Sequence, residues 1–317
     1  MLYLAPIQGY TDVFFRSAYH QTIGKIDKYF TPFFELSFDK EIIPPNKKEI
    51  LAHLNINQNL IPQLVAKNSE ELIIGAKYFI DNGFKEMNLN LGCPFPMLVK
   101  RQKGCGALPY PTDTAKMLQE FFNANLPIEL SIKTRLGLND CNELPTLLPL
   151  INHLPIKELI IHFRLGADQY KGDVRWSEME KVHQASSFKI VGNGDITTVE
   201  ELNDLQSRFP YIENWMIGRG ILINPLLALE INGFKPTAKE RLDTYKNLHK
   251  ALISTLLQEE VEQNRYMNSV KAFWFYHSQY YNDGRKIFKT ISKTSNIANY
   301  NSAVSTIWNT ISCESVE

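Results

Sequence analysis

The sequence predicts a (β/α)8 TIM barrel followed by a smaller C-terminal α-helical domain. Short apolar segments recur roughly every 25 to 35 residues, with amphipathic helical segments between them. This alternation stops near residue 235, where helical periodicity takes over. We therefore expect a barrel over residues 1–235 and a helical domain over residues 236–317. A doubly wound open sheet is the alternative to the barrel.

Eight apolar segments are expected to be strands. Alternation of strand and helix indicates parallel pairing, and eight repeats in about 235 residues suit a closed barrel. The helices between them include 69–82 and 112–123, which begin at candidate caps, Ser69 and the pair Thr112 and Asp113. The expected strands lie around residues 2–6, 28–34, 61–66, 86–91, 128–133, 158–163, 188–192 and 214–217.

The composition is that of an ordinary globular protein. The 317 residues are 44% hydrophobic and 21% charged, with a formal net charge of zero, so bulk charge does not indicate a polyanionic partner. No apolar stretch approaches the roughly 18 residues that cross a membrane, and no secretory signal pattern begins the chain. We expect a cytoplasmic monomer. The four cysteines form no C-x-x-C pair, so we expect neither a metal ion nor a redox dithiol: Cys93, Cys105, Cys141 and Cys313.

Every expected strand ends in polar or glycine residues. The carboxyl ends of parallel barrel strands meet at one rim, where barrel enzymes place their active sites. One such ending is ordinary loop composition, but eight in a row indicate a site. In chain order the endings are Pro6-Ile7-Gln8-Gly9, Glu35, Gln63, Asn90 with Cys93, Lys133 with Arg135, His162 with Arg164, Asn193-Gly194-Asp195 and Gly218-Arg219-Gly220.

The loop after the fourth strand carries the strongest sign of chemistry. Asn90 and Cys93 stand where the strand 86–91 breaks at a Gly-Cys-Pro turn, and a basic cluster and the run Gly104-Cys105-Gly106 follow. A thiol with a pKa near its usual value of about 8.5 is mostly protonated at neutral pH and can act as a general acid. A small buried residue or a disulfide partner are the alternatives, and a reducing compartment disfavours the disulfide. The basic cluster is Lys100, Arg101 and Lys103.

The last two strand endings predict a phosphate site. Barrels commonly bind phosphate after strands 7 and 8 through main-chain N–H groups, and Arg219 would add a charge-assisted contact. The alternative is that the glycines only close tight turns. Lys133 is expected to face a negative group, although a solvated rim lysine has the same sequence pattern. His162 is a candidate ligand contact or a buried core histidine.

The C-terminal part predicts helices at 238–261, 265–281, 284–292 and 299–311. Between Arg265 and Lys293 stand six basic residues and one acidic residue, with aromatic residues interleaved. Basic side chains contact phosphates and aromatic rings stack on bases, so this segment is a candidate RNA surface. A solvated helix face over an aromatic core is the alternative. Lys286 and Lys289 are the candidate RNA contacts.

Taken together, these segments resemble the tRNA-dihydrouridine synthases. The matching pieces occur in the family's order over residues 1 to 225. The Asn-x-Gly-Cys-Pro element is specific, whereas the glycine turns occur in many phosphate-binding barrels. The pieces are Leu4-Ala5-Pro6-Ile7-Gln8-Gly9-Tyr10-Thr11-Asp12, Asn88-Leu89-Asn90-Leu91-Gly92-Cys93-Pro94, Gly104-Cys105-Gly106-Ala107-Leu108, Lys133-Thr134-Arg135-Leu136-Gly137, Ile161-His162-Phe163-Arg164, Gly192-Asn193-Gly194-Asp195-Ile196 and Met216-Ile217-Gly218-Arg219-Gly220.

The resemblance implies an FMN-dependent enzyme that reduces uridines of tRNA to 5,6-dihydrouridine, with NADPH (or NADH) as reductant. It implies Cys93 as the acid that protonates carbon 5, and Asn90 and Arg135 as uracil contacts. The implied cofactor contacts are Pro6, Ile7, Gln8 and Gln63 at the flavin ring, Lys133 and His162 at its pyrimidine end, and Asn193, Gly194, Asp195, Gly218 and Arg219 at the phosphate.

The chain departs from the family pattern at two places. Phe163 stands where glycine or proline is usual, and Ile7 and Gln8 replace a methionine and a small or acidic residue. The first change leaves the roles of Arg164 and Tyr170 open. The rival functions are a small-molecule flavin oxidoreductase of the dihydroorotate or ene type and a non-catalytic RNA-binding protein.

Overall fold

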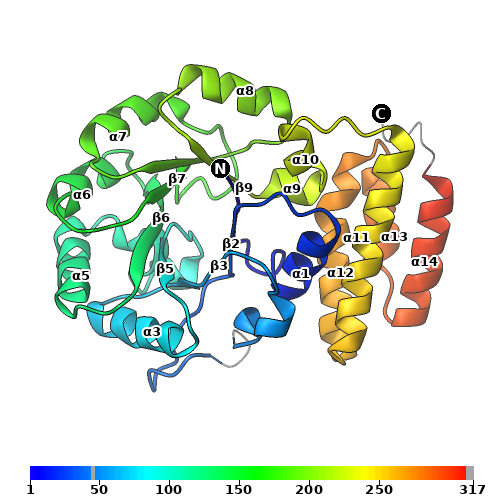
Figure 1. Ribbon diagram of the computed structural model, residues 1–317, viewed down its shortest axis with the longest axis horizontal. Helices are drawn as coiled ribbons and strands as arrows, with labels where there is room; N and C mark the ends of the chain where they lie inside the picture. Colours follow the sequence, from blue (N-terminus) through cyan, green and yellow to red (C-terminus); the bar gives the residue numbers. More distant parts are fainter. Residues whose placement is uncertain (44–46, 312–317) are drawn as a thin grey trace.

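The structure, a computed structural model, describes residues 1–43 and 47–311; Cys313 lies outside the described residues. Within them, nine parallel strands form a nearly closed barrel surrounded by helices (Figure 1). The strands follow the order β3-β2-β1-β9-β8-β7-β6-β5-β4 around the barrel. Their bounds are β1 Leu2–Leu4, β2 Lys28–Phe30, β3 Leu60–Ile61, β4 Gln63–Leu64, β5 Glu86–Leu91, β6 Glu129–Gly137, β7 Leu159–Leu165, β8 Ile190–Asn193 and β9 Asn214–Ile217.

The two edges of this sheet, β3 and β4, are halves of one expected strand. Only Pro62 separates them, and proline has no N–H to give to the ladder. β3 pairs with β2 and β4 pairs with β5, while the Pro62 carbonyl accepts from the Asn88 N–H at 2.9 Å. The predicted eight-stranded barrel is confirmed, with its third strand in two pieces. An open doubly wound sheet is wrong, because the two edges meet.

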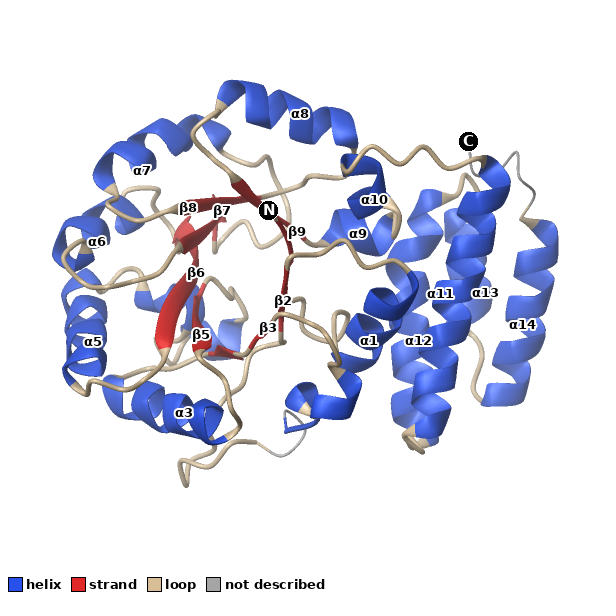
Figure 2. Cartoon of the chain, in the orientation of Figure 1, coloured by secondary structure: helices blue, strands red, loops and turns tan. Residues whose placement is uncertain are grey.

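Helices cover the outside of the barrel (Figure 2). Two of the expected caps are wrong. Asn68 caps α3 through a bond from the Glu71 N–H at 3.0 Å, and α5 begins at Pro111, whose missing N–H is no loss at the first helical position. The barrel helices are α1 Val13–Thr22, α3 Ser69–Asp81, α4 Pro96–Val99, α5 Pro111–Asn123, α6 Glu143–Ile151, α7 Met179–Ala185, α8 Val199–Arg208, α9 Arg219–Ile223 and α10 Leu227–Ile231.

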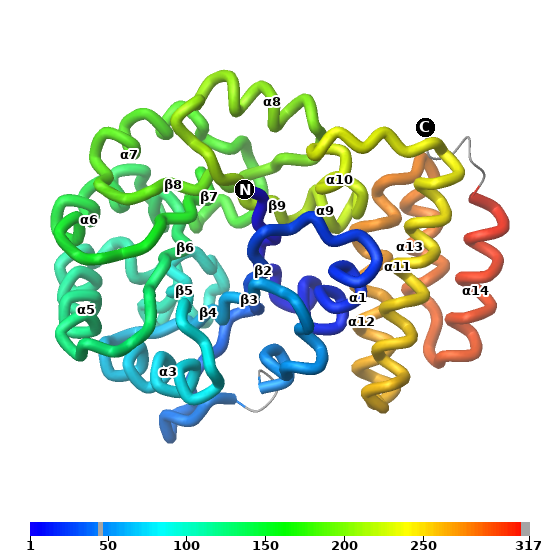
Figure 3. Tube along the Cα trace, in the orientation of Figure 1, coloured from blue at the N-terminus to red at the C-terminus, as the bar shows by residue number. Residues whose placement is uncertain are grey.

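The C-terminal helices form a bundle beside α1 and α9 (Figures 1 and 3). Thr237 and Glu240 make a capping box at the start of α11, just after the expected boundary near residue 235. The His277 ring bonds the Ile223 carbonyl at 3.1 Å, and the apolar core runs without a break from barrel to bundle. The boundary near residue 235 falls between α10 and α11 and stays a prediction. The bundle contains α11 Ala238–Gln258, α12 Gln263–His277, α13 Gly284–Ser292 and α14 Ile297–Thr310.

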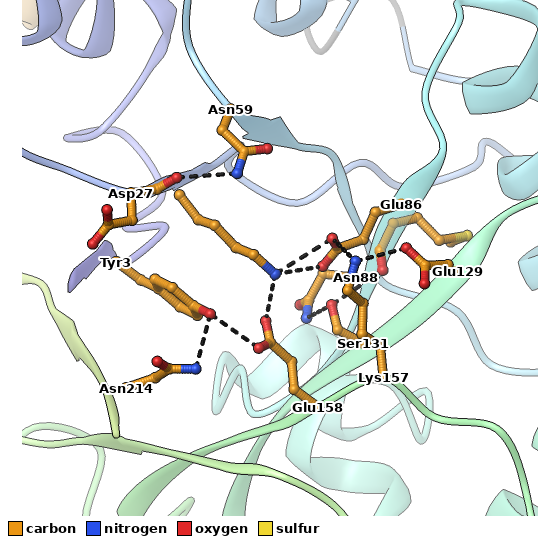
Figure 4. A network of polar contacts seen from close by, with 12 residues as sticks. Tyr3, Asp27, Asn59, Glu86, Asn88, Glu129, Ser131, Lys157, Glu158 and Asn214 are labelled. Atoms are coloured by element: carbon orange, nitrogen blue, oxygen red, sulfur yellow. Dashed lines mark hydrogen bonds and ion pairs between the residues drawn. The ribbon is translucent and has the colours of Figure 1, made fainter. Parts of the chain in front are cut away.

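A buried polar network fills the amino-terminal end of the barrel. The Lys28 ammonium lies 3.0 Å from a Glu86 oxygen and 2.9 Å from a Glu158 oxygen. The Tyr3 hydroxyl donates to Glu158 at 3.0 Å and accepts from Asn214 at 3.2 Å, so side chains from distant strands converge (Figure 4). These bonds satisfy polar groups that would be costly to bury alone, and they leave the opposite end of the barrel for chemistry.

Candidate active site

A cavity opens at the carboxyl ends of β1, β6, β7, β8 and β9. Nine of the residues predicted to bind a cofactor line it together, although they come from five separate strand ends. They are Pro6, Ile7, Lys133, His162, Asn193, Gly194, Asp195, Gly218 and Arg219, joined by Ala5, Tyr170, Ile196, Met216, Ile217 and Gly220. The barrel therefore gathers at one place the endings that the sequence separates.

Lys133 is the central cation of this cavity. Its ammonium donates to Asn193 Oδ1 at 3.0 Å, and Asn193 donates in turn to the Met216 carbonyl at 2.8 Å. Burial, together with the nearby Arg135 guanidinium, lowers the pKa of Lys133 to about 7. No carboxylate of residues 1–43 or 47–311 pairs with Lys133, and an anionic ligand in the cavity would restore its charge.

His162 is buried beside Lys133 and is held by Arg164. An Arg164 nitrogen lies 3.2 Å from His162 Nε2, and the guanidinium also donates to the Gly172 carbonyl at 2.7 Å. A guanidinium has no acceptor, so His162 Nε2 accepts this bond and the ring proton lies on Nδ1. Burial and the neighbouring Arg135, Lys133 and Arg164 hold the pKa of His162 well below its usual value. The imidazole is therefore neutral.

Asp195 joins two arginines at the cavity wall. Its carboxylate pairs with Arg164 on one oxygen and with Arg219 on the other. Burial opposes its charge, but these two partners outweigh burial and hold the pKa of Asp195 below its usual value. The Arg219 guanidinium also lies 5.3 Å from the centre of the Tyr170 ring, and Arg135 lies 5.4 Å from the same ring. Tyr170 thus stands between two cations at the mouth.

A chain of amides leads from the barrel interior to the thiol loop. Gln63 is fully buried and donates to Asn88 Oδ1 at 2.8 Å, while Asn90 donates to Gln63 Oε1 at 2.8 Å. Asn90 Oδ1 accepts from the main-chain N–H groups of Gly92 and Cys93, each at 2.9 Å. The predicted residues Gln63 and Asn90 therefore fix one another and the start of the Cys93 turn.

The Cys93 thiol is half-buried beside this chain. Burial raises its pKa, and the Phe95 N–H and the cations Arg135 and Lys133 offset the rise only in part. Arg135 supports the same turn by donating to the Gly92 carbonyl at 3.0 Å. The thiol is thus protonated at neutral pH, the form that a proton donor needs.

Gln8 and the two predicted RNA contacts lie away from both the cavity and the Cys93 turn. Gln8 lines a separate hollow between the barrel and α12, together with Asp12, Glu49 and Arg265. Lys286 and Lys289 are exposed on α13, where Lys286 borders a groove of about 610 Å³. Four of the eight aromatic residues of this segment pack inside the bundle, as the alternative interpretation expected, and the other four keep some exposure: Tyr266, Phe273, Trp274 and Tyr281 are buried.

Phe163 does not enter the cavity. It is fully buried and packs against Trp176, with 5.2 Å between ring centres. Successive strand residues point to opposite faces, so Phe163 turns outward because His162 and Arg164 turn toward the site. The departure from the family pattern therefore changes packing behind β7 and leaves the cavity wall in place.

Tyr276 is one of the aromatic residues interleaved in the basic C-terminal segment, and its place at the barrel mouth was not expected. Its ring meets Tyr10 of the β1–α1 loop, with 4.7 Å between ring centres. Burial raises the pKa of Tyr276 to about 12, and Arg219 and Tyr170 are close enough to influence it. α12 thus adds a tyrosine to the barrel mouth. No local pattern could indicate this, because the contact depends on how the bundle docks.

Within residues 1–43 and 47–311, no group of three His, Cys, Asp or Glu side chains is arranged to hold a metal ion. No helix in the same residues is both long and apolar enough to cross a membrane.

Similar proteins decide the family. The sequence pattern of the family described as "Dihydrouridine synthase (Dus)" matches residues 3–310. The chain belongs to the dihydrouridine synthase family. It is therefore an oxidoreductase, because forming dihydrouridine from uridine adds two hydrogen atoms.

Relatives of this family align over most of the chain. "Probable tRNA-dihydrouridine synthase 2" of Bacillus subtilis (strain 168) is 31% identical over 269 residues, which cover 81% of this chain and 79% of that protein. "Probable tRNA-dihydrouridine synthase" of Staphylococcus aureus (strain N315) is 28% identical over 268 residues, 82% and 79% of the two chains. A solved structure of morphinone reductase superposes with a TM-score of 0.52 at 10% identity, over 73% of this chain and 85% of the other. That similarity supports the barrel fold alone.

The cavity suits an anionic ligand. Lys133 pairs with no carboxylate in the described part of the chain, Arg219 reaches the wall after β9, and His162 presents a neutral ring. A Cβ at Gly218 would lie 3.0 Å from Ile7 and 3.2 Å from Ala5, two residues of the lining. The glycine thus leaves room for the side chains of these two residues beside the turn after β9. The Lys133 and Arg219 donors suit a negatively charged group.

Proposed function

We propose that this enzyme reduces specific uridines of tRNA to 5,6-dihydrouridine, with FMN as cofactor and NADPH (or NADH) as reductant. The observation that carries the proposal is the cavity lined by Lys133 and Arg219 beside the protonated Cys93 thiol at one barrel mouth. The family and the names of its relatives support the reaction and the tRNA substrate. We expect a monomer in the cytoplasm that uses no metal ion.

The residues of the cavity have distinct roles in holding the cofactor. Arg219 and the turns at Gly194 and Gly218 would hold the phosphate, with Asp195 contributing through its main chain, since its carboxylate already serves Arg164 and Arg219. Lys133 and His162 would contact the pyrimidine end of the ring, and Pro6, Ile7, Gln8 and Gln63 would lie near the ring. FMN, when bound, supplies the hydride that reduces carbon 6 of the uracil.

Cys93 would complete the reduction as a general acid. Its S–H bond breaks as a C–H bond forms at carbon 5, so that one proton balances the hydride at carbon 6. Asn90 and Arg135 would hold the uracil, because both are anchored to the Gly92-Cys93 turn. A uridine must leave its stack to reach this mouth, which calls for a second surface that grips the RNA.

The bundle offers that surface. Lys286 and Lys289 are exposed on α13, and the partly exposed rings of Phe275 and Phe288 contact one another at 5.3 Å between centres. Phe275 also meets Tyr10 at 5.6 Å, so an aromatic row leads from the groove to the mouth. Such rows of cations and rings suit a nucleic-acid strand.

The first test is the dihydrouridine content of bulk tRNA, mapped by position, in cells with and without the gene. Loss at one position supports the proposal and identifies the target uridine. Unchanged content at every position, with a flavin-loaded protein in hand, would favour a small-molecule flavin oxidoreductase. A colourless protein that binds tRNA would instead favour the non-catalytic RNA-binding function.

A further inference from the structure

The basic cluster of the Cys93 loop separates into two kinds of residue. Lys100 and Arg101 are exposed, whereas the Lys103 side chain is only 5% exposed. The Lys103 ammonium lies 2.9 Å from a Glu71 oxygen and 3.3 Å from a Glu35 oxygen. A lysine buried between two carboxylates is not available to an RNA phosphate, so it calls for another role.

The two carboxylates are fixed by separate elements. Glu71 stands in the first turn of α3, and its carboxylate also accepts from the Lys67 N–H at 2.9 Å. Glu35 follows β2 and pairs with Arg101 at 2.8 Å as well as with Lys103. Lys103 therefore ties the loop after β5 to the rim beyond β2 and to the start of α3. We call these three side chains, Lys103, Glu35 and Glu71, the loop clamp.

Gly104 links the loop clamp to the Cys93 thiol through backbone packing. It follows Lys103 directly, has a φ of +58°, and a Cβ there would lie 2.5 Å from the Cys93 carbonyl oxygen. The next residue, Cys105, donates its N–H to that same carbonyl at 3.1 Å. The backbone beside Lys103 thus rests on the backbone of Cys93, and a shift of the clamp displaces the thiol.

We propose that Lys103 is a positioning residue that holds the Cys93 thiol in place through the loop clamp. Removing the ammonium releases the loop from Glu71 and leaves Arg101 as its remaining ion pair to Glu35. A buried carboxylate that loses its partner cation becomes hydrated or repels its neighbour, so the loop shifts. The consequence for catalysis rests on the proposed role of Cys93 as proton donor. The consequence for the thiol itself does not.

The experiment compares Lys103→Met with Lys103→Arg and with Lys157→Met. Lys157 is the matched control, since it also bridges two glutamates, Glu86 at 2.8 Å and Glu129 at 2.6 Å, but at the far end of the barrel. Iodoacetamide labelling of each folded protein, read by mass spectrometry peptide by peptide, gives the alkylation rates of Cys93 and Cys141. Dihydrouridine formation and flavin reduction by NADPH are measured on the same preparations.

We expect Lys103→Met to raise the alkylation rate of Cys93 several-fold and leave that of Cys141 unchanged, because the thiol becomes more exposed. Dihydrouridine formation should fall about tenfold to a hundredfold, the loss that a displacement near 1 Å produces, with flavin reduction unaltered. Lys103→Arg should restore most of both properties, and Lys157→Met should resemble the unsubstituted protein. If Lys103→Met does not fold, Glu71→Gln weakens the same clamp without changing its shape.

Two outcomes separate this proposal from the proposed function. A Cys93 alkylation rate that stays at its original value in folded Lys103→Met overturns the clamp, whatever happens to activity. Faster alkylation with full dihydrouridine formation supports the clamp but removes Cys93 from the proton-donor role.

Discussion

The Lys133 ammonium and the side-chain carbonyl of Asn193 lie 3.0 Å apart and join β6 to β8 across the barrel mouth. A neutral amide is a weak partner for a half-buried cation. The pair therefore leaves Lys133 short of negative charge, and both residues line the cavity that suits an anionic ligand. Substitutions of Lys133 therefore test both the binding of an anionic ligand and the pH dependence of the free energy of unfolding.

Lys133 gives the cofactor-free protein a pH-dependent stability. Its pKa is about 7 in the folded state against an ordinary 10.5, so between these values the unfolded chain binds a proton that the folded chain does not. The free energy of unfolding therefore rises with pH across this window. Urea unfolding at several pH values should show this rise weakened in Lys133→Met and retained in the surface variant Lys189→Met. Equal slopes in all three proteins would contradict the lowered pKa.

Cys93→Ala should separate the two halves of the reaction. Flavin content and flavin reduction by NADPH should be retained, while dihydrouridine formation falls by about 10²- to 10⁴-fold, the usual contribution of a general acid. In the unsubstituted protein this step should also slow at high pH, because burial raises the pKa of Cys93 and only its protonated form donates. Cys141→Ala, outside the cavity, is the control. Full activity of Cys93→Ala would transfer the proton-donor role to another group.

Arg219→Met should weaken FMN retention. A hydrogen bond to a charged group contributes about 1.5–3 kcal/mol, so the dissociation constant should increase roughly tenfold to a hundredfold. Flavin fluorescence titration of the cofactor-free protein measures it. Arg208→Met removes an exposed arginine whose ion pair with Asp204 lies on α8, and should leave the constant unchanged. An equal FMN dissociation constant in both variants would indicate that the phosphate binds elsewhere.

Exchanging two lysines of α13 for glutamate should weaken tRNA binding. Lys286→Glu with Lys289→Glu removes two phosphate contacts, so the plot of log affinity against log salt should flatten by about two slope units. Lys77→Glu with Lys116→Glu makes the same charge change on α3 and α5, on the side of the barrel away from the bundle (Figure 1). Filter binding at several salt concentrations compares the two. An equal loss of tRNA affinity in both double variants would indicate that net charge, and not a defined surface on α13, governs tRNA binding.

Lys28→Met should cost much of the stability of the barrel. It leaves the Glu158 carboxylate buried without a cation, while Glu86 keeps Lys157, and breaking a buried ion pair typically costs about 3–5 kcal/mol. Lys189→Met breaks an exposed pair with Glu213 and should cost no more than about 1 kcal/mol. Denaturant unfolding measures both. Similar values for the two variants would mean that water reaches the end of the barrel.

The sequence by itself determined the barrel, the bundle and the strand endings. Apolar periodicity and turn residues are local properties, so the strand 214–217 and the helix 284–292 have their expected bounds. Nine of the expected cofactor residues share one cavity because parallel strands bring their carboxyl ends to one rim.

Only the tertiary structure decided which distant groups meet. The sequence shows Lys100, Arg101 and Lys103 as one basic cluster, yet closure of the barrel buries Lys103 between Glu35 and Glu71. Docking of α12 likewise brings Tyr276 against Tyr10 at the mouth. Such contacts join segments tens to hundreds of residues apart, and no local propensity encodes them. They depend on the register of the strands and on packing between helices, which are set by the whole chain at once.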